Sequence, residues 1–210
     1  MPPPKPVRIL LVDDHPLFRE GLGMVIQSQP DLLLVGQAEN AEDAFSQFRL
    51  IRPDVTIMGQ RLPGTSGTDA LIAIRKECPR AIVIMMNTSK RDIHVRRALN
   101  AGAAAYVLKN TAKEEMLRVI RWVSEGRRHI PSEIARTLAE HLGQEELSPR
   151  EISVLRLIRD GYRNKQIGPC LGIAETTVNF HIRNIVEKLQ ANDRTHAVTI
   201  GFQRGLLELE

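Results

Sequence analysis

The first 126 residues alternate short apolar runs with segments of helical periodicity. The apolar runs are rich in Val, Ile and Leu and mostly lack polar alternation, which is typical of strands buried on both faces of a parallel sheet. They predict strands at Ile9–Val12, Leu32–Gln37, Val55–Met58, Ala81–Met86 and Ala104–Leu108. Helices are predicted from Pro16 onward and over Asn40–Leu50, Gly67–Cys78, Arg91–Ala101 and Thr111–Glu125. Five successive βα units indicate an α/β fold with a doubly wound, five-stranded parallel sheet.

The strand pattern disappears after residue 126. Residues 127–146 are interpreted as a linker with one short helix, Ser132–His141. Residues 147–210 then show only helical patterns, which predict a small all-α domain. Its expected helices are Pro149–Asp160, Asn164–Leu171, Glu175–Leu189 and Arg194–Leu206. The chain is therefore expected to hold an α/β domain at 1–126 and an all-α domain at 147–210.

Composition narrows the functional classes. The 210 residues are 42% hydrophobic and 26% charged, as in ordinary globular proteins. The net charge of +4 permits nucleic-acid binding without establishing it, because a solvated basic surface would give the same value. Residues 1–6 lack the apolar stretch of a signal peptide, and no run approaches the roughly 18 apolar residues of a membrane span. We expect a cytoplasmic protein without membrane partners.

Charged side chains follow two of the predicted strands. Asp13 and Asp14 come directly after the first strand, and Lys109 follows the fifth. Ligands of doubly wound sheets bind beyond the carboxyl ends of the strands, and adjacent carboxylates can hold Mg²⁺. The spacing alone leaves open that Asp14 only caps a helix and that Lys109 is a surface residue.

The sequence around these positions resembles response-regulator receivers of the NarL/FixJ type. The resemblance rests on the segments Leu10–Pro16, Pro53–Gly64 and Ala101–Lys109. In such receivers an acidic pair and a phosphorylatable Asp bind Mg²⁺, and a Thr or Ser and a Lys sense the phosphoryl group. The resemblance makes Asp13 and Asp14 the acidic pair, Lys109 the lysine and Tyr106 the switch aromatic.

Two positions depart from that pattern. The phosphorylatable Asp falls at Gly59, and the switch hydroxyl falls at Asn87. Glycine offers no nucleophile, so this degenerate pocket is expected to lack aspartyl phosphorylation. Losing a carboxylate ligand should also leave Mg²⁺ binding weak or absent, so no cofactor is expected. Asp54 lies roughly 13 Å away along the strand, at its opposite end, and cannot replace the missing group.

The helix predicted at Glu175–Leu189 separates two kinds of side chain. Val178, Ile182, Ile185 and Leu189 recur at helical spacing and form one buried stripe. The opposite side carries Thr176, Asn179, Phe180 and Arg183, which are groups that can contact bases or phosphates. An ordinary amphipathic helix would show the same stripe, but the aromatic Phe180 on the polar side weighs against that alternative.

The stretch from Leu147 to Leu206 resembles the LuxR-type helix-turn-helix domain. The resemblance makes Glu175–Leu189 the recognition helix, which would lie in the major groove, and makes Arg194–Leu206 a dimer contact. Arg183 and Asn179 are expected to read guanine and adenine, and Lys165 and Lys188 to meet phosphates. The full set of expected DNA-binding residues is Lys165, Thr176, Thr177, Asn179, Phe180, His181, Arg183 and Lys188.

Three features depart from the LuxR-type pattern. Ala174 replaces a common Ser or Thr cap, at an expected cost on the order of 1 kcal/mol. The pair Gly168-Pro169 falls inside a short helix, which proline can kink. Asn179 stands where Lys is frequent, which should weaken phosphate attraction.

These observations favour a sequence-specific transcription regulator that binds double-stranded DNA as a homodimer. The alternative hypothesis is a pseudo-receiver that modulates another regulator, with weak DNA binding. An enzyme is not expected, because Asp13 and Asp14 lack a partnered nucleophile and the histidines are scattered. An unidentified regulatory protein or ligand could replace phosphorylation as the signal.

Overall fold

The computed structural model describes residues 5–88, 92–132, 134–136 and 145–207. The chain forms two compact units, of which the first comprises residues 1–90 and 94–136 and the second residues 91–93 and 137–210. Each unit is considered by itself.

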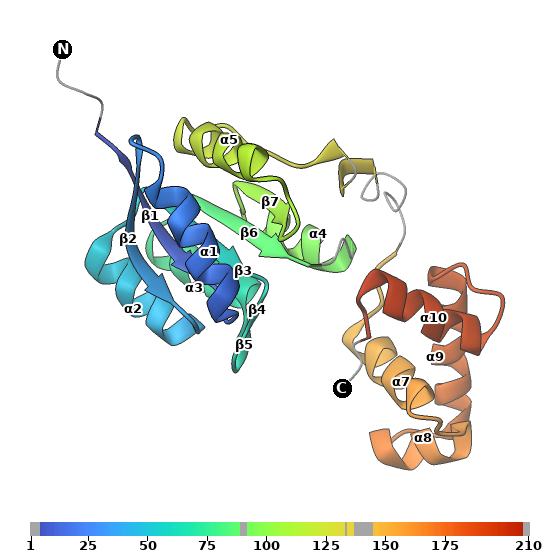
Figure 1. Cartoon of the computed structure of the whole chain (residues 1–210). Helices are drawn as coiled ribbons and strands as arrows, with labels where there is room; N and C mark the ends of the chain where they lie inside the picture. The colour runs from blue at the N-terminus through green and yellow to red at the C-terminus, as the bar shows by residue number, and fades with distance from the viewer. Residues whose placement is uncertain (1–4, 89–91, 133, 137–144, 208–210) are drawn as a thin grey trace. The chain divides into compact units, whose positions relative to one another are not determined.

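The first unit is built on a five-stranded parallel sheet with the order β2-β1-β3-β6-β7 (Figure 1). The sequence-based expectation of an α/β doubly wound sheet is confirmed. Every predicted strand is present within two residues of its expected ends: β1 (Val7–Val12), β2 (Leu32–Ala38), β3 (Val55–Gly59), β6 (Val83–Asn87) and β7 (Ala105–Leu108).

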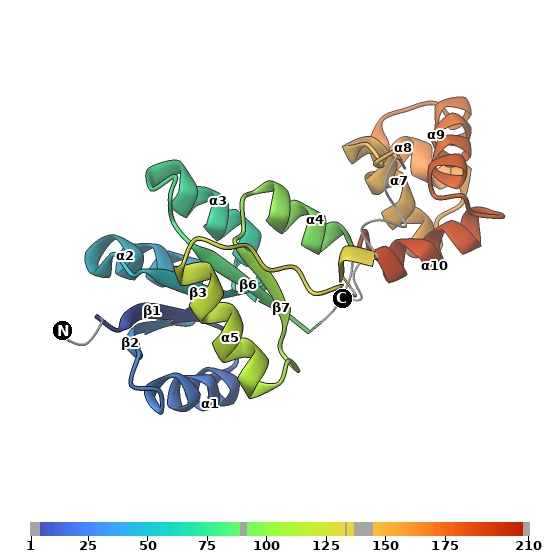
Figure 2. The ribbon, with the colours of Figure 1, turned by 90° about the horizontal axis from the view of Figure 1, so that it is seen from above.

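Helices cover both faces of this sheet (Figure 2). One face carries α1 (Pro16–Gln27) and α5 (Lys113–Ser124). The other carries α2 (Ala41–Ile51), α3 (Gly67–Glu77) and α4 (Asp92–Asn100). Strand residues such as Ile9, Ile57 and Val107 are fully buried in the core that α1 and α5 cover. This two-sided burial explains why the strand sequences are continuously apolar.

A short antiparallel hairpin between β3 and α3 was not predicted from the sequence. It consists of β4 (Arg61–Leu62) and β5 (Thr65–Ser66). Gly64 turns the chain between them with φ of 77°, which favours glycine. Strands of two residues are too short to show a hydrophobic period.

The chain stays attached to the sheet beyond residue 126. His129 donates its backbone N–H to the carbonyl of Ala104 at 3.0 Å and accepts from the N–H of Tyr106 at 3.2 Å. These bonds extend the edge of the sheet beside β7. Ser132 and residues 134–136 are helical, and the rest of the helix expected at Ser132–His141 lies outside the described residues.

The second unit is helical, as expected. Its described elements are α7 (Pro149–Arg159), α8 (Asn164–Leu171), α9 (Glu175–Lys188) and α10 (Arg194–Arg204). Ser148 and Glu151 form a capping box at the start of α7. The core gathers apolar side chains from all of these helices, including Val154, Ile167, Val178 and Ala197.

The turn between α8 and α9 explains Gly168. A Cβ at Gly168 would lie 2.8 Å from the carbonyl oxygen of Ile173, so only glycine allows this close approach. Gly172 then ends α8 in the left-handed region, with φ of 66°. Pro169 lies within α8, which continues to Leu171. The glycine is therefore a requirement of the turn rather than a defect.

In the part of the chain that the structure describes, no helix is both long and apolar enough to span a membrane.

Candidate functional site

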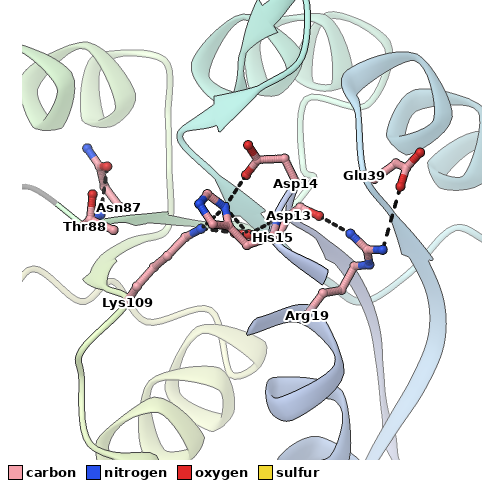
Figure 3. Close-up of polar contacts among 8 residues, drawn as sticks. All are labelled: Asp13, Asp14, His15, Arg19, Glu39, Asn87, Thr88 and Lys109. Carbon is pink, nitrogen blue, oxygen red and sulfur yellow. Dashed lines mark hydrogen bonds and ion pairs between the residues drawn. The ribbon is translucent and has the colours of Figure 1, made fainter. Parts of the chain in front are cut away.

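The polar pocket of the first unit lies at the carboxyl ends of the strands, where the topology of the sheet changes direction between β1 and β3. Asp13 follows β1, Gly59 ends β3, Asn87 ends β6 and Lys109 follows β7. Asp13 is fully buried, and Lys109 Nζ lies 2.7 Å from its Oδ1 (Figure 3). Asp13 and Lys109, which the sequence singled out after the first and fifth strands, are thus in direct contact.

His15 joins this cluster, although it was not predicted to belong to it. Its Nδ1 lies 2.6 Å from Asp14 Oδ1 and 3.2 Å from Lys109 Nζ (Figure 3). The backbone N–H of His15 also donates to Asp13 Oδ1 at 3.0 Å. Arg19 binds the main-chain carbonyl of Asp13 from the first turn of α1. The carboxylates are therefore engaged by groups of the protein itself.

Gly59 determines how Asp13 is placed. A Cβ built at Gly59 would lie 2.7 Å from Asp13 Oδ2, so the carboxylate reaches into the space where a side chain would begin. Among the described residues, this buried oxygen has no hydrogen-bond partner. Asp54 is not nearby, because its Oδ2 accepts from the N–H of Arg8 at 2.8 Å at the start of β1. The pocket therefore offers no carboxylate at the position expected for phosphorylation.

The same geometry bears on Mg²⁺. The ion prefers near-octahedral oxygen coordination, and receivers supply part of it through the phosphorylatable Asp. Here Gly59 contributes no ligand, and the Lys109 ammonium already neutralises Asp13 at 2.7 Å. Asp13, Asp14 and His15 nevertheless bring potential metal-ligand atoms within 4.8 Å of one another, so weak or absent Mg²⁺ binding stays a prediction.

The two switch positions are also buried. Tyr106 is fully enclosed, and Asn87 is 7% exposed. Burial raises the pKa of Tyr106 to about 12, and the neighbouring Asn87 amide offsets part of that rise. No hydrogen bond of ordinary geometry reaches the Tyr106 hydroxyl from the described residues. Asn87 Oδ1 instead accepts from the N–H of Thr88 at 2.8 Å.

Helix α9 presents the two faces that its sequence predicted. Val178 and Ile185 are buried in the core of the second unit. The side chains of Thr176, Asn179, Phe180 and Arg183 are exposed, whereas Thr177 and His181 are half-buried. Phe180 is 58% exposed although it is a large apolar side chain. The N-cap residue Ala174 provides no side-chain hydrogen bond, as expected.

A series of side-chain hydrogen bonds, which was not predicted from the sequence, links helices α10, α8 and α9. Arg194 donates through Nη1 to Asn164 Oδ1 at 3.0 Å and through Nη2 to the carbonyl of Tyr162 at 2.9 Å. Asn164 Nδ2 then donates to Asn179 Oδ1 at 2.7 Å. The side chain of Asn179 is therefore held from α8, whose own start is tied to α10.

The two lysines expected to meet phosphates differ in their surroundings. Lys165 is exposed in the first turn of α8. Lys188 instead donates to the buried carboxylate of Glu151 at 3.0 Å, and this bond raises the pKa of Lys188 despite partial desolvation. The bond to Glu151 gives Lys188 a structural role, and its phosphate contact stays a prediction.

Comparison with known proteins supports the architecture. Residues 9–121 match the model of the response regulator receiver domain, and residues 145–200 match that of bacterial regulatory proteins of the luxR family. The chain is 31% identical to the response regulator VraR of Staphylococcus aureus over 96% of its own length and 99% of VraR.

Solved structures give the same result. The response regulator ChrA of a haem-sensing two-component system is 30% identical, with 97% of this chain and 100% of ChrA covered and a TM-score of 0.58. RcsB of Salmonella enterica serovar Typhimurium shares the fold at 20% identity, with a TM-score of 0.72 over 92% of this chain and 97% of RcsB.

The fold and the paired domains define a two-component transcription regulator rather than an enzyme. The chain belongs to the response regulator family, in the NarL/FixJ-type group that combines a receiver with a LuxR-type helix-turn-helix domain.

Proposed function

We propose that this protein is a sequence-specific DNA-binding regulator that works without aspartyl phosphorylation. The observation that carries the proposal is Gly59 at the end of β3, with the Asp13 carboxylate reaching into the vacated space and paired with Lys109 at 2.7 Å. A side chain that is absent cannot accept a phosphoryl group. The pocket needs no cofactor in this state.

The DNA-binding part of the proposal rests on α9. Its exposed Asn179, Phe180 and Arg183 provide an amide, an apolar ring and a guanidinium on one face. These groups match base edges, the thymine methyl group and guanine or phosphate, respectively. Lys165 is exposed at the start of α8, where it can contact the phosphate backbone of DNA.

We further propose that the protein binds as a homodimer. Each chain offers one recognition helix, and a single helix buries too little surface for high specificity. The expected operator has two similar half-sites about one helical turn apart.

Selection of bound sequences from random duplex DNA by the full-length protein, followed by footprinting, tests this function. We expect an enriched sequence and two protected half-sites. Protection of a lone asymmetric half-site by a monomer would contradict the dimer. A failure to enrich any sequence would instead favour a pseudo-receiver that acts on another regulator. The observation that supports this alternative is the uncapped start of α9 at Ala174.

A further inference from the structure

The side chain of Asn179 is held in one orientation by residues that lie far from it in the sequence. Asn179 projects from the exposed face of α9, at a position where the LuxR-type pattern frequently has lysine. Asn164, fifteen residues earlier, donates to its Oδ1 at 2.7 Å. Arg194, thirty residues beyond Asn164, donates to Asn164 Oδ1 at 3.0 Å.

The donor and the acceptor in each of these hydrogen bonds follow from the chemistry of arginine. A guanidinium can only donate hydrogen bonds, so the atom of Asn164 that faces Arg194 must be its oxygen. The amide nitrogen of Asn164 then faces Asn179, and a nitrogen of this kind can only donate. Asn179 must therefore turn its oxygen inward. The usual ambiguity between the two ends of an amide is removed by the charged donor at the far end of the chain.

We infer that Asn164 and Arg194 are positioning residues that make Asn179 a hydrogen-bond donor toward DNA. This inference rests on the proposed DNA-binding function and deepens it. With its oxygen held by Asn164, Asn179 directs its NH₂ group to the exposed face. That group matches acceptors in the major groove, namely guanine O6 and N7, adenine N7 and thymine O4. The base that Asn179 meets is read as an acceptor, which replaces the preference for adenine expected from an unconstrained asparagine.

The substitution Asn164→Asp should reverse the orientation of the Asn179 amide, with almost no change in the shape of the side chain at position 164. Arg194 would pair with one carboxylate oxygen, and the other oxygen would face Asn179. Since a carboxylate only accepts, Asn179 would turn its NH₂ inward and its oxygen toward the DNA. The variant should then prefer the donor groups of adenine N6 or cytosine N4 at one base position.

The experiment measures binding of full-length wild type and variants to the selected duplex and to its single-base substitutions. For Asn164→Asp we expect a change in preference of about fivefold to a hundredfold at one base position in each half-site, with other positions unchanged. Asn164→Ala should relax the preference at that same position without reversing it. Asn179→Ala should abolish it in both the wild-type and the Asn164→Asp background.

Structural damage and base recognition give different results. Thermal unfolding identifies any variant that fails to fold. If Asn164→Asp is such a variant, the base preference of Asn164→Ala tests the inference instead. An equal loss of affinity on every duplex, with preferences unchanged, would overturn the inference and leave Asn164 as a structural residue only. If wild type itself selects no sequence, the proposed function fails, and that outcome is distinct from a wild type that selects a site whose preferences Asn164→Asp leaves intact.

Discussion

Removal of the Glu151 side chain is expected to weaken the helix-turn-helix unit. Its Oε2 accepts from the N–H of Ser148 at 2.7 Å and from Lys188 Nζ at 3.0 Å, and the residue is only 3% exposed. The single carboxylate thus completes the cap of α7 and binds the end of α9. Glu151→Ala removes both bonds at once.

The size of the effect follows from those two bonds. Loss of the hydrogen bond that Glu151 accepts from the N–H of Ser148 costs about 0.5–1.5 kcal/mol. Loss of a hydrogen bond to a charged group costs about 1.5–3 kcal/mol. We expect Glu151→Ala to lower the unfolding free energy of the unit by about 2–4 kcal/mol, from a total of about 3–9 kcal/mol for a unit of this size. Glu151→Gln keeps an acceptor for Ser148 and should cost about half as much.

Thermal unfolding of the full-length protein, with hydrogen exchange of peptides from residues 149–207, measures this change. A loss of 2 kcal/mol should lower the Tm of the unit by about 8–16 °C. Glu187→Ala is the matched control, because Glu187 is exposed on α9 next to Lys188. If Glu151→Ala unfolded within about 0.5 kcal/mol of wild type, the assignment of Lys188 to Glu151 would be wrong.

The effect should also depend on pH. Burial pushes the pKa of Glu151 upward, but the hydrogen bonds from Ser148 and Lys188 outweigh it and hold the pKa below its usual value of 4.5. The carboxylate therefore stabilises the fold above about pH 4.5, and this stability is lost as the pH falls through the lowered pKa. The difference between wild type and Glu151→Gln should be constant from neutral pH to about pH 5 and should vanish in more acidic solution.

Three further changes test other parts of the structure. Gly59→Asp should raise Mg²⁺ affinity at least about tenfold once Asp13 turns aside, as measured by calorimetric titration, and equal affinities would mean that the pocket cannot reopen. Arg183→Ala should cost about 1–3 kcal/mol on the selected duplex and relax one base preference, whereas Lys165→Ala should weaken all duplexes and reduce the salt slope by about one. A uniform loss for Arg183→Ala would refute its base contact. Gly168→Ala should destabilise the turn by about 1–3 kcal/mol in thermal unfolding, and an unchanged Tm would contradict the close approach.

The fold could be predicted from the sequence because its signals are local. Each strand of the main sheet is a short apolar run such as Leu10–Val12, and the helices carry apolar residues at regular spacing. The hairpin at Arg61–Ser66 has no such signal, since pairs of residues cannot show a period. The positions of Asp13 and Lys109 could be predicted from the ends of the strands, because a parallel sheet brings the carboxyl ends of its strands to one edge.

The roles that could not be predicted depend on contacts between distant residues. Lys188 lies at the end of the helix predicted at Glu175–Leu189. The residues around it in the sequence do not indicate its hydrogen bond to Glu151, which lies thirty-seven residues earlier. The chain from Arg194 through Asn164 to Asn179 likewise joins three helices. Polar residues at the first turns of α8 and α10 were visible in the sequence, but their partners are set only by packing.

Independence from phosphorylation is tested most directly by treating the full-length protein with a small phosphodonor and Mg²⁺, then measuring its intact mass and its Kd for the selected duplex. With Gly59 at the acceptor position and Asp13 paired with Lys109, we expect no gain of mass and a Kd within about twofold of the untreated protein. A stable gain of one phosphoryl group on the receiver, accompanied by a change in Kd, would contradict it.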